Sequence, residues 1–190
     1  VVDYCVYADT DFPPGRYQVL IEADGPVDVS KTEEYSRIID EKLGLANSGG
    51  YRMPNYDRTV SVINLTTFRV VKTIDVAINL HRLELDHHGL LWVSSRGDYY
   101  NVPSKTYVID THTDEVCDSL ELANSEMALA GDSLYVYGTA WSYRTNSWNI
   151  SYAVVDTHKR KVVSNRLITD GTDAHIAMPY GIAVNPDNGD

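Results

Sequence analysis

The chain has 190 residues, of which 43% are apolar, 16 are Lys or Arg and 27 are Asp or Glu. Such a chain can bury a proper core, so it is not a disordered tail. The formal charge of -11 disfavours nucleic acid as a partner, because binding to phosphates depends on clustered Lys and Arg. No apolar run reaches the roughly 18 residues that span a bilayer, and residues 1–30 lack the pattern of an export signal.

Short segments in which apolar and polar residues alternate follow one another along the chain, which predicts β-strands. Many of their residues are β-branched, and such residues favour strands over helices, so helical repeats are excluded. In chain order, we expect strands within the segments 2–8, 17–23, 36–40, 42–47, 62–67, 69–74, 82–86, 90–95, 108–113, 115–120, 127–130, 133–137, 154–159, 161–167 and 180–187.

One motif recurs three times with a spacing of 46 residues, as Val62–Thr67, Val108–Thr113 and Val154–Lys159. Each copy is followed by a second short strand, and the Asx-Thr step between the two is typical of a hairpin turn. The repeated Asx residues are therefore expected to cap turns through local hydrogen bonds rather than to catalyse a reaction. They are Asn64, Asp110 and Asp156. Together with two earlier strands, each unit has four strands in about 46 residues, which is the period of a β-propeller blade.

The sequence thus predicts an all-β fold, a β-propeller of four-stranded antiparallel blades. We expect outer strands of one blade in the irregular residues 1–35, further blades at 36–79, 80–124 and 125–179, and the start of the next at 180–190. This gives about four blade equivalents, and a closed propeller needs roughly four to eight. One alternative is closure of the ring by two part-blades. We expect instead a fragment of a larger ring, because an unpaired strand edge promotes aggregation.

Five stretches carry a resemblance to a known family: Ala46–Tyr51, Asn55–Ile63, Leu91–Gly97, Tyr107–Thr111 and Pro179–Pro186. With these motifs, residues 36–190 resemble the YncE-like seven-bladed β-propellers found among surface lipoproteins of Bacteroidetes. The resemblance implies a seven-bladed ring without enzymatic activity on the outer face of the outer membrane. One branch of the family captures cobalamin above a TonB-dependent transporter. The resemblance also implies an export signal and a lipidated cysteine upstream of Val1.

The connections between the expected strands differ in length on the two faces of the propeller. On one face the turns at 65–69, 86–89, 111–114, 130–132 and 157–160 are short. On the other face the loops at 48–58, 96–104 and 140–149 are long and rich in aromatic residues, Arg and Asn. Binding groups usually lie on loops that a rigid scaffold carries, and Tyr, Trp and Arg dominate binding hot spots.

We therefore expect the long loops to bind a ligand through Tyr51, Arg52, Tyr56, Arg96, Tyr99, Tyr100, Trp141, Tyr143, Arg144 and Trp148. His81 and Tyr180 begin inner strands, and we expect them at the mouth of the central channel, within reach of the same ligand. The alternative is that the aromatic rings cover blade edges and pack on neighbouring loops, with His81 a solvated loop residue.

No metal site and no cofactor are expected. Cys5 and Cys117 lie in alternating runs and are interpreted as small core side chains. The histidines of the short turns are assigned to turn roles, since His112 and His158 occupy equivalent positions. His87 and His88 are not expected to share a metal, because adjacent strand residues point to opposite faces. Residues 187–190 are interpreted as a β-turn rather than a calcium loop.

The leading hypothesis is a non-enzymatic, surface-exposed protein that captures a small molecule and passes it to an outer-membrane transporter. The resemblance makes cobalamin the first candidate, with a glycan as the other. The alternative is an interaction scaffold within an outer-membrane complex. A third hypothesis, a propeller lyase or hydrolase, would use the loop carboxylates Asp57 and Asp98, although no catalytic motif is present.

Overall fold

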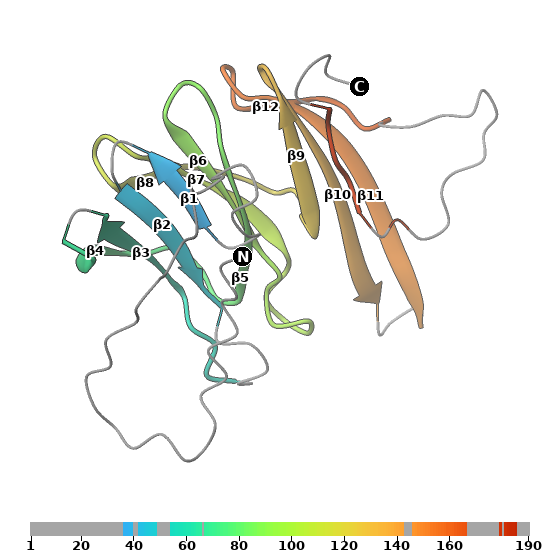
Figure 1. Ribbon diagram of the computed structural model, residues 1–190. Helices are drawn as coiled ribbons and strands as arrows, with labels where there is room; N and C mark the ends of the chain where they lie inside the picture. The colour runs from blue at the N-terminus through green and yellow to red at the C-terminus, as the bar shows by residue number, and fades with distance from the viewer. Residues whose placement is uncertain are drawn as a thin grey trace. The chain divides into compact units, whose positions relative to one another are not determined.

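The computed structural model describes residues 36–39, 42–48, 54–65, 67–142, 146–166, 179 and 181–185 (Figure 1). The chain divides into two compact units, Val1–Thr32 and Glu33–Asp190, and every described residue belongs to the second unit. The strands expected at 2–8 and 17–23, together with Cys5, lie outside the described residues.

Twelve strands run through the described residues. They are β1 (Ser36–Ile39), β2 (Lys42–Asn47), β3 (Thr59–Asn64), β4 (Arg69–Asp75), β5 (Leu80–Leu85), β6 (Leu90–Ser95), β7 (Lys105–Asp110), β8 (Glu115–Leu120), β9 (Glu126–Ala130), β10 (Ser133–Ser142), β11 (Ser147–Asp156) and β12 (Lys161–Ser164). This part of the chain contains no helix long and apolar enough to cross a membrane.

The strands form three four-stranded antiparallel sheets in which neighbours in sequence are neighbours in space. We call β1–β4 the first blade, β5–β8 the second and β9–β12 the third (Figure 1). The innermost strand of the second blade, β5, packs against β1 and β2 of the first blade and against β9 of the third. The predicted all-β fold of four-stranded antiparallel blades is confirmed, whereas the exact blade boundaries stay a prediction.

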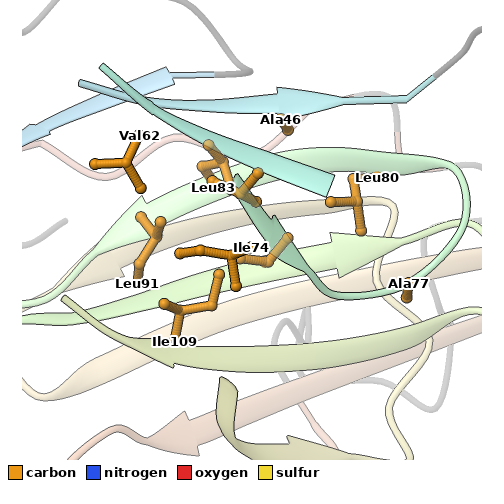
Figure 2. Close-up of a cluster of buried hydrophobic side chains, with 10 residues drawn as sticks. Ala46, Val62, Ile74, Ala77, Leu80, Leu83, Leu91 and Ile109 are labelled. Carbon is orange, nitrogen blue, oxygen red and sulfur yellow. The ribbon is translucent and has the colours of Figure 1, made fainter. Parts of the chain in front are cut away.

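Apolar side chains fill the space between consecutive blades. One cluster joins the first and second blades and includes Val62, Leu80 and Leu83 (Figure 2). A second cluster joins the second and third blades and includes Trp92 and Leu134. Each such side chain contributes about 1.5–3 kcal/mol when it is fully buried. The blades are therefore held together mainly by these two layers.

The middle strand β6 shows how the sequence places side chains in both layers. Leu91 and Val93 belong to the first cluster, and Trp92 between them belongs to the second. Successive residues of a strand point to opposite faces of the sheet. Because both faces of the second blade are covered, this strand is a continuous apolar run, Leu90–Val93, instead of an alternating one.

The turns between the two outer strands have the same backbone features in all three blades, at positions 46 residues apart. Asn64 Oδ1 accepts a hydrogen bond from Thr67 N, Asp110 Oδ1 from His112 N, and Asp156 Oδ1 from Lys159 N, each at 2.8 Å. The residues at 68, 114 and 160 all have positive φ, between 50° and 53°. Each preceding strand carries a bulge at the same repeat position. The predicted capping role of the Asx residues is confirmed.

Asp86 anchors the turn between β5 and β6 from inside the protein. Its buried carboxylate accepts hydrogen bonds from His88 N, Leu90 N and Trp92 Nε1, each at 2.9 Å. Burying a carboxylate is costly unless hydrogen bonds compensate it. Here the three hydrogen bonds compensate the cost. They also connect the turn to the indole of Trp92, which belongs to the second cluster.

Three expectations about local structure are corrected. Cys117 is exposed rather than part of the core, because β8 is the outer strand of its blade and begins with three exposed residues. Residues 140–149 are mostly strand, since β10 and β11 continue as a paired hairpin to Ser142 and Ser147. Residues 181–185 form no strand within the segment expected at 180–187, because no described strand offers them backbone partners.

Candidate functional site

The candidate site lies at the ends of the blades where the connections β2–β3, β6–β7 and β10–β11 emerge. Consecutive antiparallel strands place these three connections on one face, which we call the loop face, together with the starts of β5 and β9. Seven of the predicted ligand residues can be placed there: Tyr56, His81, Arg96, Tyr99, Tyr100, Trp141 and Trp148. Five lie outside the described residues: Tyr51, Arg52, Tyr143, Arg144 and Tyr180.

The β6–β7 loop is a compact structure built around Asp98. Its Oδ1 accepts hydrogen bonds from the backbone N–H groups of Tyr100 at 2.9 Å and of Asn101 and Val102 at 2.7 Å. The bonds from Val102 and Tyr100 lower the pKa of Asp98 below its ordinary value, and burial opposes them only in part. The carboxylate therefore holds the loop in one shape.

This loop presents aromatic side chains to solvent. Tyr99, which has a φ of +66°, and Tyr100 are both exposed, Tyr100 by 60%. Tyr56 belongs to the neighbouring β2–β3 loop, and partial burial, followed by the nearby Tyr99, Asp98 and Tyr100, raises its pKa above the ordinary value. The structure thus brings together three of the tyrosines that the sequence nominated.

Asn79, which the sequence analysis did not select, joins these two loops. Its Nδ2 donates to Gly97 O at 3.0 Å, its backbone N donates to Asp57 O at 3.0 Å, and its carbonyl accepts from Arg96 N at 3.0 Å. Asn79 is buried and has a φ of +54°, a conformation that Asn tolerates better than most residues. In the sequence, the only indication of this structural role was an Asn directly before an apolar strand, and that pattern is a weak predictor.

His81 is buried beneath Arg96 rather than exposed at a channel mouth. The residue is 2% exposed, and its Nε2 lies 2.6 Å from Arg96 Nη2 and 3.4 Å from Glu126 Oε1. The tautomer of the ring decides which contact is a hydrogen bond: Nε2 accepts from Arg96 when the ring proton is on Nδ1, and it donates to Glu126 when the proton is on Nε2. In this conformation His81 orients Arg96, which differs from both sequence interpretations, direct ligand contact and a solvated loop.

Glu126 at the start of β9 completes this polar cluster across the boundary between the second and third blades. Its carboxylate pairs with the guanidinium of Arg82. Burial raises the pKa of Glu126, but the hydrogen bonds from His81 and Arg82 outweigh that effect and lower the pKa below its ordinary value. Charged groups at the inner strand starts are thus paired, and they tie the second blade to the third beneath the loop face.

The third blade contributes a pair of tryptophans. Trp141 and Trp148 are directly opposite on β10 and β11, with ring centroids 5.4 Å apart and an interplanar angle of 70°. Such an edge-to-face pair contributes about 0.5–1.5 kcal/mol beyond the area it buries. The pair extends the hairpin in place of the predicted loop, and Trp148 remains 51% exposed.

The loop face therefore combines exposed aromatic rings on the second and third blades with a buried polar layer. Among the described residues of this face, no three side chains are grouped to hold a metal ion. Rigid rings with polar tips suit contact with planar or sugar-like ligands.

Several solved structures resemble the chain, among them three β-propeller proteins. Hydrazine synthase of Kuenenia stuttgartiensis aligns with a TM-score of 0.54 and 21% identity over 67% of this chain. BamB of Moraxella catarrhalis and apo AztD of Citrobacter koseri each align with a TM-score of 0.45, at 13% and 14% identity, over 68% of this chain. With the three four-stranded antiparallel sheets, the likeness to hydrazine synthase identifies the fold as a β-propeller.

At these identities the likeness concerns the fold alone. The chain spans 34%, 32% and 45% of the three solved chains, in the same order. No protein-family model matches the chain, and no curated protein matches it.

Proposed function

We propose that this propeller is a non-enzymatic binding protein that captures a small molecule on its loop face. The observation that carries the proposal is the exposure of Tyr99, Tyr100 and Trp148 on neighbouring blades. The first two sit on a loop that Asp98 and Asn79 hold in one shape, and the third on a paired hairpin. Because the backbone that carries these side chains is already ordered, binding loses little backbone conformational entropy.

Arg96 adds a polar function to this face. Its guanidinium carries five N–H donors, and the contact with His81 uses one of them. Aromatic faces beside a guanidinium suit a large ligand that has both a flat or ring-shaped apolar surface and hydrogen-bond acceptors. A corrin with amide side chains and an oligosaccharide both meet this description.

The resemblance to YncE-like propellers supports cobalamin as the first candidate ligand. It also supports a location on the outer face of the outer membrane as a lipoprotein, with hand-off of the ligand to a TonB-dependent transporter. The absence of catalysis is part of the proposal. Two carboxylates were considered for a hydrolase. One of them, Asp98, accepts three backbone hydrogen bonds at its Oδ1, which supports a structural role for it.

Isothermal titration calorimetry of the 190-residue chain against cobalamin and a panel of oligosaccharides tests the proposal. We expect saturable binding to one of them, and at least a tenfold loss of affinity in Trp148→Ala or Tyr99→Ala, since hot-spot aromatics contribute about 2 kcal/mol or more. Phe68→Ala is the matched control, because it removes an exposed ring from the opposite face. Undiminished binding by both loop-face variants would refute the proposed face.

A second candidate function, a protein-interaction scaffold, is favoured by the outer strands. Val70 and Val71 on β4, and Val162 and Val163 on β12, are exposed apolar residues. Apolar groups gathered at a surface often mark contacts between proteins. In this case Val71→Lys would abolish recovery of a stoichiometric partner in a pull-down, Trp148→Ala would not, and no small molecule would shift the melting temperature.

A further inference from the structure

The face opposite to the loop face carries a group of imidazoles and one carboxylate that the proposed function does not use. His87 and His88 lie in the short turn between β5 and β6, and Asp132 lies in the turn between β9 and β10. The group thus joins the second blade to the third. All three side chains are exposed, and one ligand atom from each lies within 4.8 Å of the others.

The adjacent histidines point the same way because they are not in a strand. The alternation that would send them to opposite faces holds only for extended backbone. Here residues 87 and 88 form a turn, and Asp86 takes the buried position and binds the backbone N of His88 at 2.9 Å. The two imidazole rings lie with their centroids 4.0 Å apart.

Both imidazoles converge on a single oxygen. Nε2 of His87 lies 3.2 Å from Asp132 Oδ1, and Nε2 of His88 lies 2.8 Å from the same atom. Ligand atoms that sit about 2.0–2.1 Å from a tetrahedral zinc ion are about 3.3 Å from each other. The two nitrogen–oxygen separations are therefore close to those of an occupied site, and all three ligand atoms lie within 4.8 Å of one another.

The turn that carries Asp132 is held by the third blade, and two further side chains lie near the group. Thr157 donates its backbone N–H and its hydroxyl to Asp132 O, at 2.9 Å and 3.2 Å, and so fixes the Asp132 turn to the third blade. The ring of His158, the next residue, lies 5.2 Å from that of His88, between centroids. Lys159 is engaged by Asp156 at 2.6 Å, so its ammonium is directed to a carboxylate outside the group.

We propose that His87, His88 and Asp132 bind a divalent transition-metal ion of the zinc class between the second and third blades. Imidazole nitrogen suits Zn²⁺, Cu²⁺ and Ni²⁺, whereas Ca²⁺ and Mg²⁺ require oxygen ligands. Three protein ligands leave the fourth position to water or, after rotation of its ring, to His158. Because the ion would link two blades, it also stabilises their junction.

Calorimetric titration of the metal-stripped chain with Zn²⁺ tests this site. We expect one high-affinity ion per chain, and a loss of affinity of at least about tenfold in His88→Ala and in Asp132→Asn, since even outer partners of metal ligands are worth about 10–100-fold. The matched control is His112→Ala, an exposed histidine in another turn of the same face whose Nδ1 faces Asp110. This control should bind Zn²⁺ as the wild-type chain does.

Thermal unfolding gives a second readout, because an ion that binds only the native state raises the melting temperature. Zn²⁺ should raise it for the wild-type chain and for His112→Ala but not for His88→Ala, and Ca²⁺ should raise it for none of them. Absence of Zn²⁺ binding by the wild-type chain, or equal affinity in His88→Ala and Asp132→Asn, would overturn the proposal. Ligand capture on the opposite face does not depend on this outcome.

Discussion

Replacement of Gly97 by Ala tests whether the shape of the β6–β7 loop is fixed by close backbone packing. Gly97 is buried with a φ of +66°, and a Cβ atom there would lie 2.0 Å from Val102 O and 2.8 Å from Pro103 C. Both are backbone atoms, so no side-chain rotation can relieve the overlap. The loop that presents Tyr99 and Tyr100 would have to move.

Two other glycines separate the parts of this effect. At Gly131 φ is +55° and no atom lies within 4 Å of an added Cβ, so Gly131→Ala reports the conformational cost alone. We expect about 1 kcal/mol for it. At Gly138 an added Cβ would lie 2.4 Å from Ala123 O without a positive φ, so Gly138→Ala reports overpacking, about 1–3 kcal/mol.

Gly97→Ala combines both costs, and we expect it to lower the free energy of unfolding by about 2–4 kcal/mol. With an m-value of about 2 kcal/mol/M, this lowers the urea midpoint by about 1–2 M. Tryptophan fluorescence during urea titration measures the midpoint for all three variants. If Gly97→Ala loses no more stability than Gly131→Ala, the close packing of this loop is refuted.

Three further predictions concern the core, the buried turn and the polar cluster. Leu83→Ala should cost about 2–5 kcal/mol of unfolding free energy in urea titration, because Leu83 is fully buried between two blades. Trp92→Phe should cost about 1–3 kcal/mol in the same assay, since the buried carboxylate of Asp86 loses its indole donor. The pKa of Glu126 is lowered in the folded protein, so its pairing stabilises the fold above the unfolded pKa, about 4.3, and this contribution is lost as the pH falls through the folded pKa. Acid titration of the melting temperature should therefore show a weaker decline below about pH 4.3 for Glu126→Gln than for the wild-type chain.

Each of these predictions has its own control. Val71→Ala, at an exposed position of β4, should change stability by less than about 0.5 kcal/mol. An equal loss in Leu83→Ala and Val71→Ala would contradict the assignment of the core. A Trp92→Phe variant as stable as the wild-type chain would mean that the Asp86 carboxylate finds another donor. A decline with acid that is identical in Glu126→Gln would show that other carboxylates govern it.

The fold was predictable because its determinants are local and repeated. The Asx turn, the bulge before it and the positive φ after it recur at the same 46-residue spacing as the sequence motif. Alternation of apolar residues then defines which strands pair within a blade. Exposure was less predictable, as Cys117 shows, because the same alternation occurs on covered and uncovered strands.

The site was predictable in part. The tyrosines of the loop face were selected from composition, since aromatic residues in long loops stand out in a sequence, and their role in ligand binding stays a prediction. The hairpin that pairs Trp141 with Trp148 was not, because a cross-strand ring contact forms only once the two strands are in register. A shared metal site at His87 and His88 was not expected, because the two residues were assumed to lie in a strand and to point to opposite faces.

By itself the sequence determined the blade: four strands, their order and the turns that join them, because hydrogen bonds between residues close in the chain decide these features. Only the tertiary structure decided which side chains meet between blades. His81 meets Glu126, and His88 meets Asp132, across separations of 45 and 44 residues in the chain. Such contacts depend on how one sheet packs on the next, and the packing is set by the shape of the buried layers between the blades.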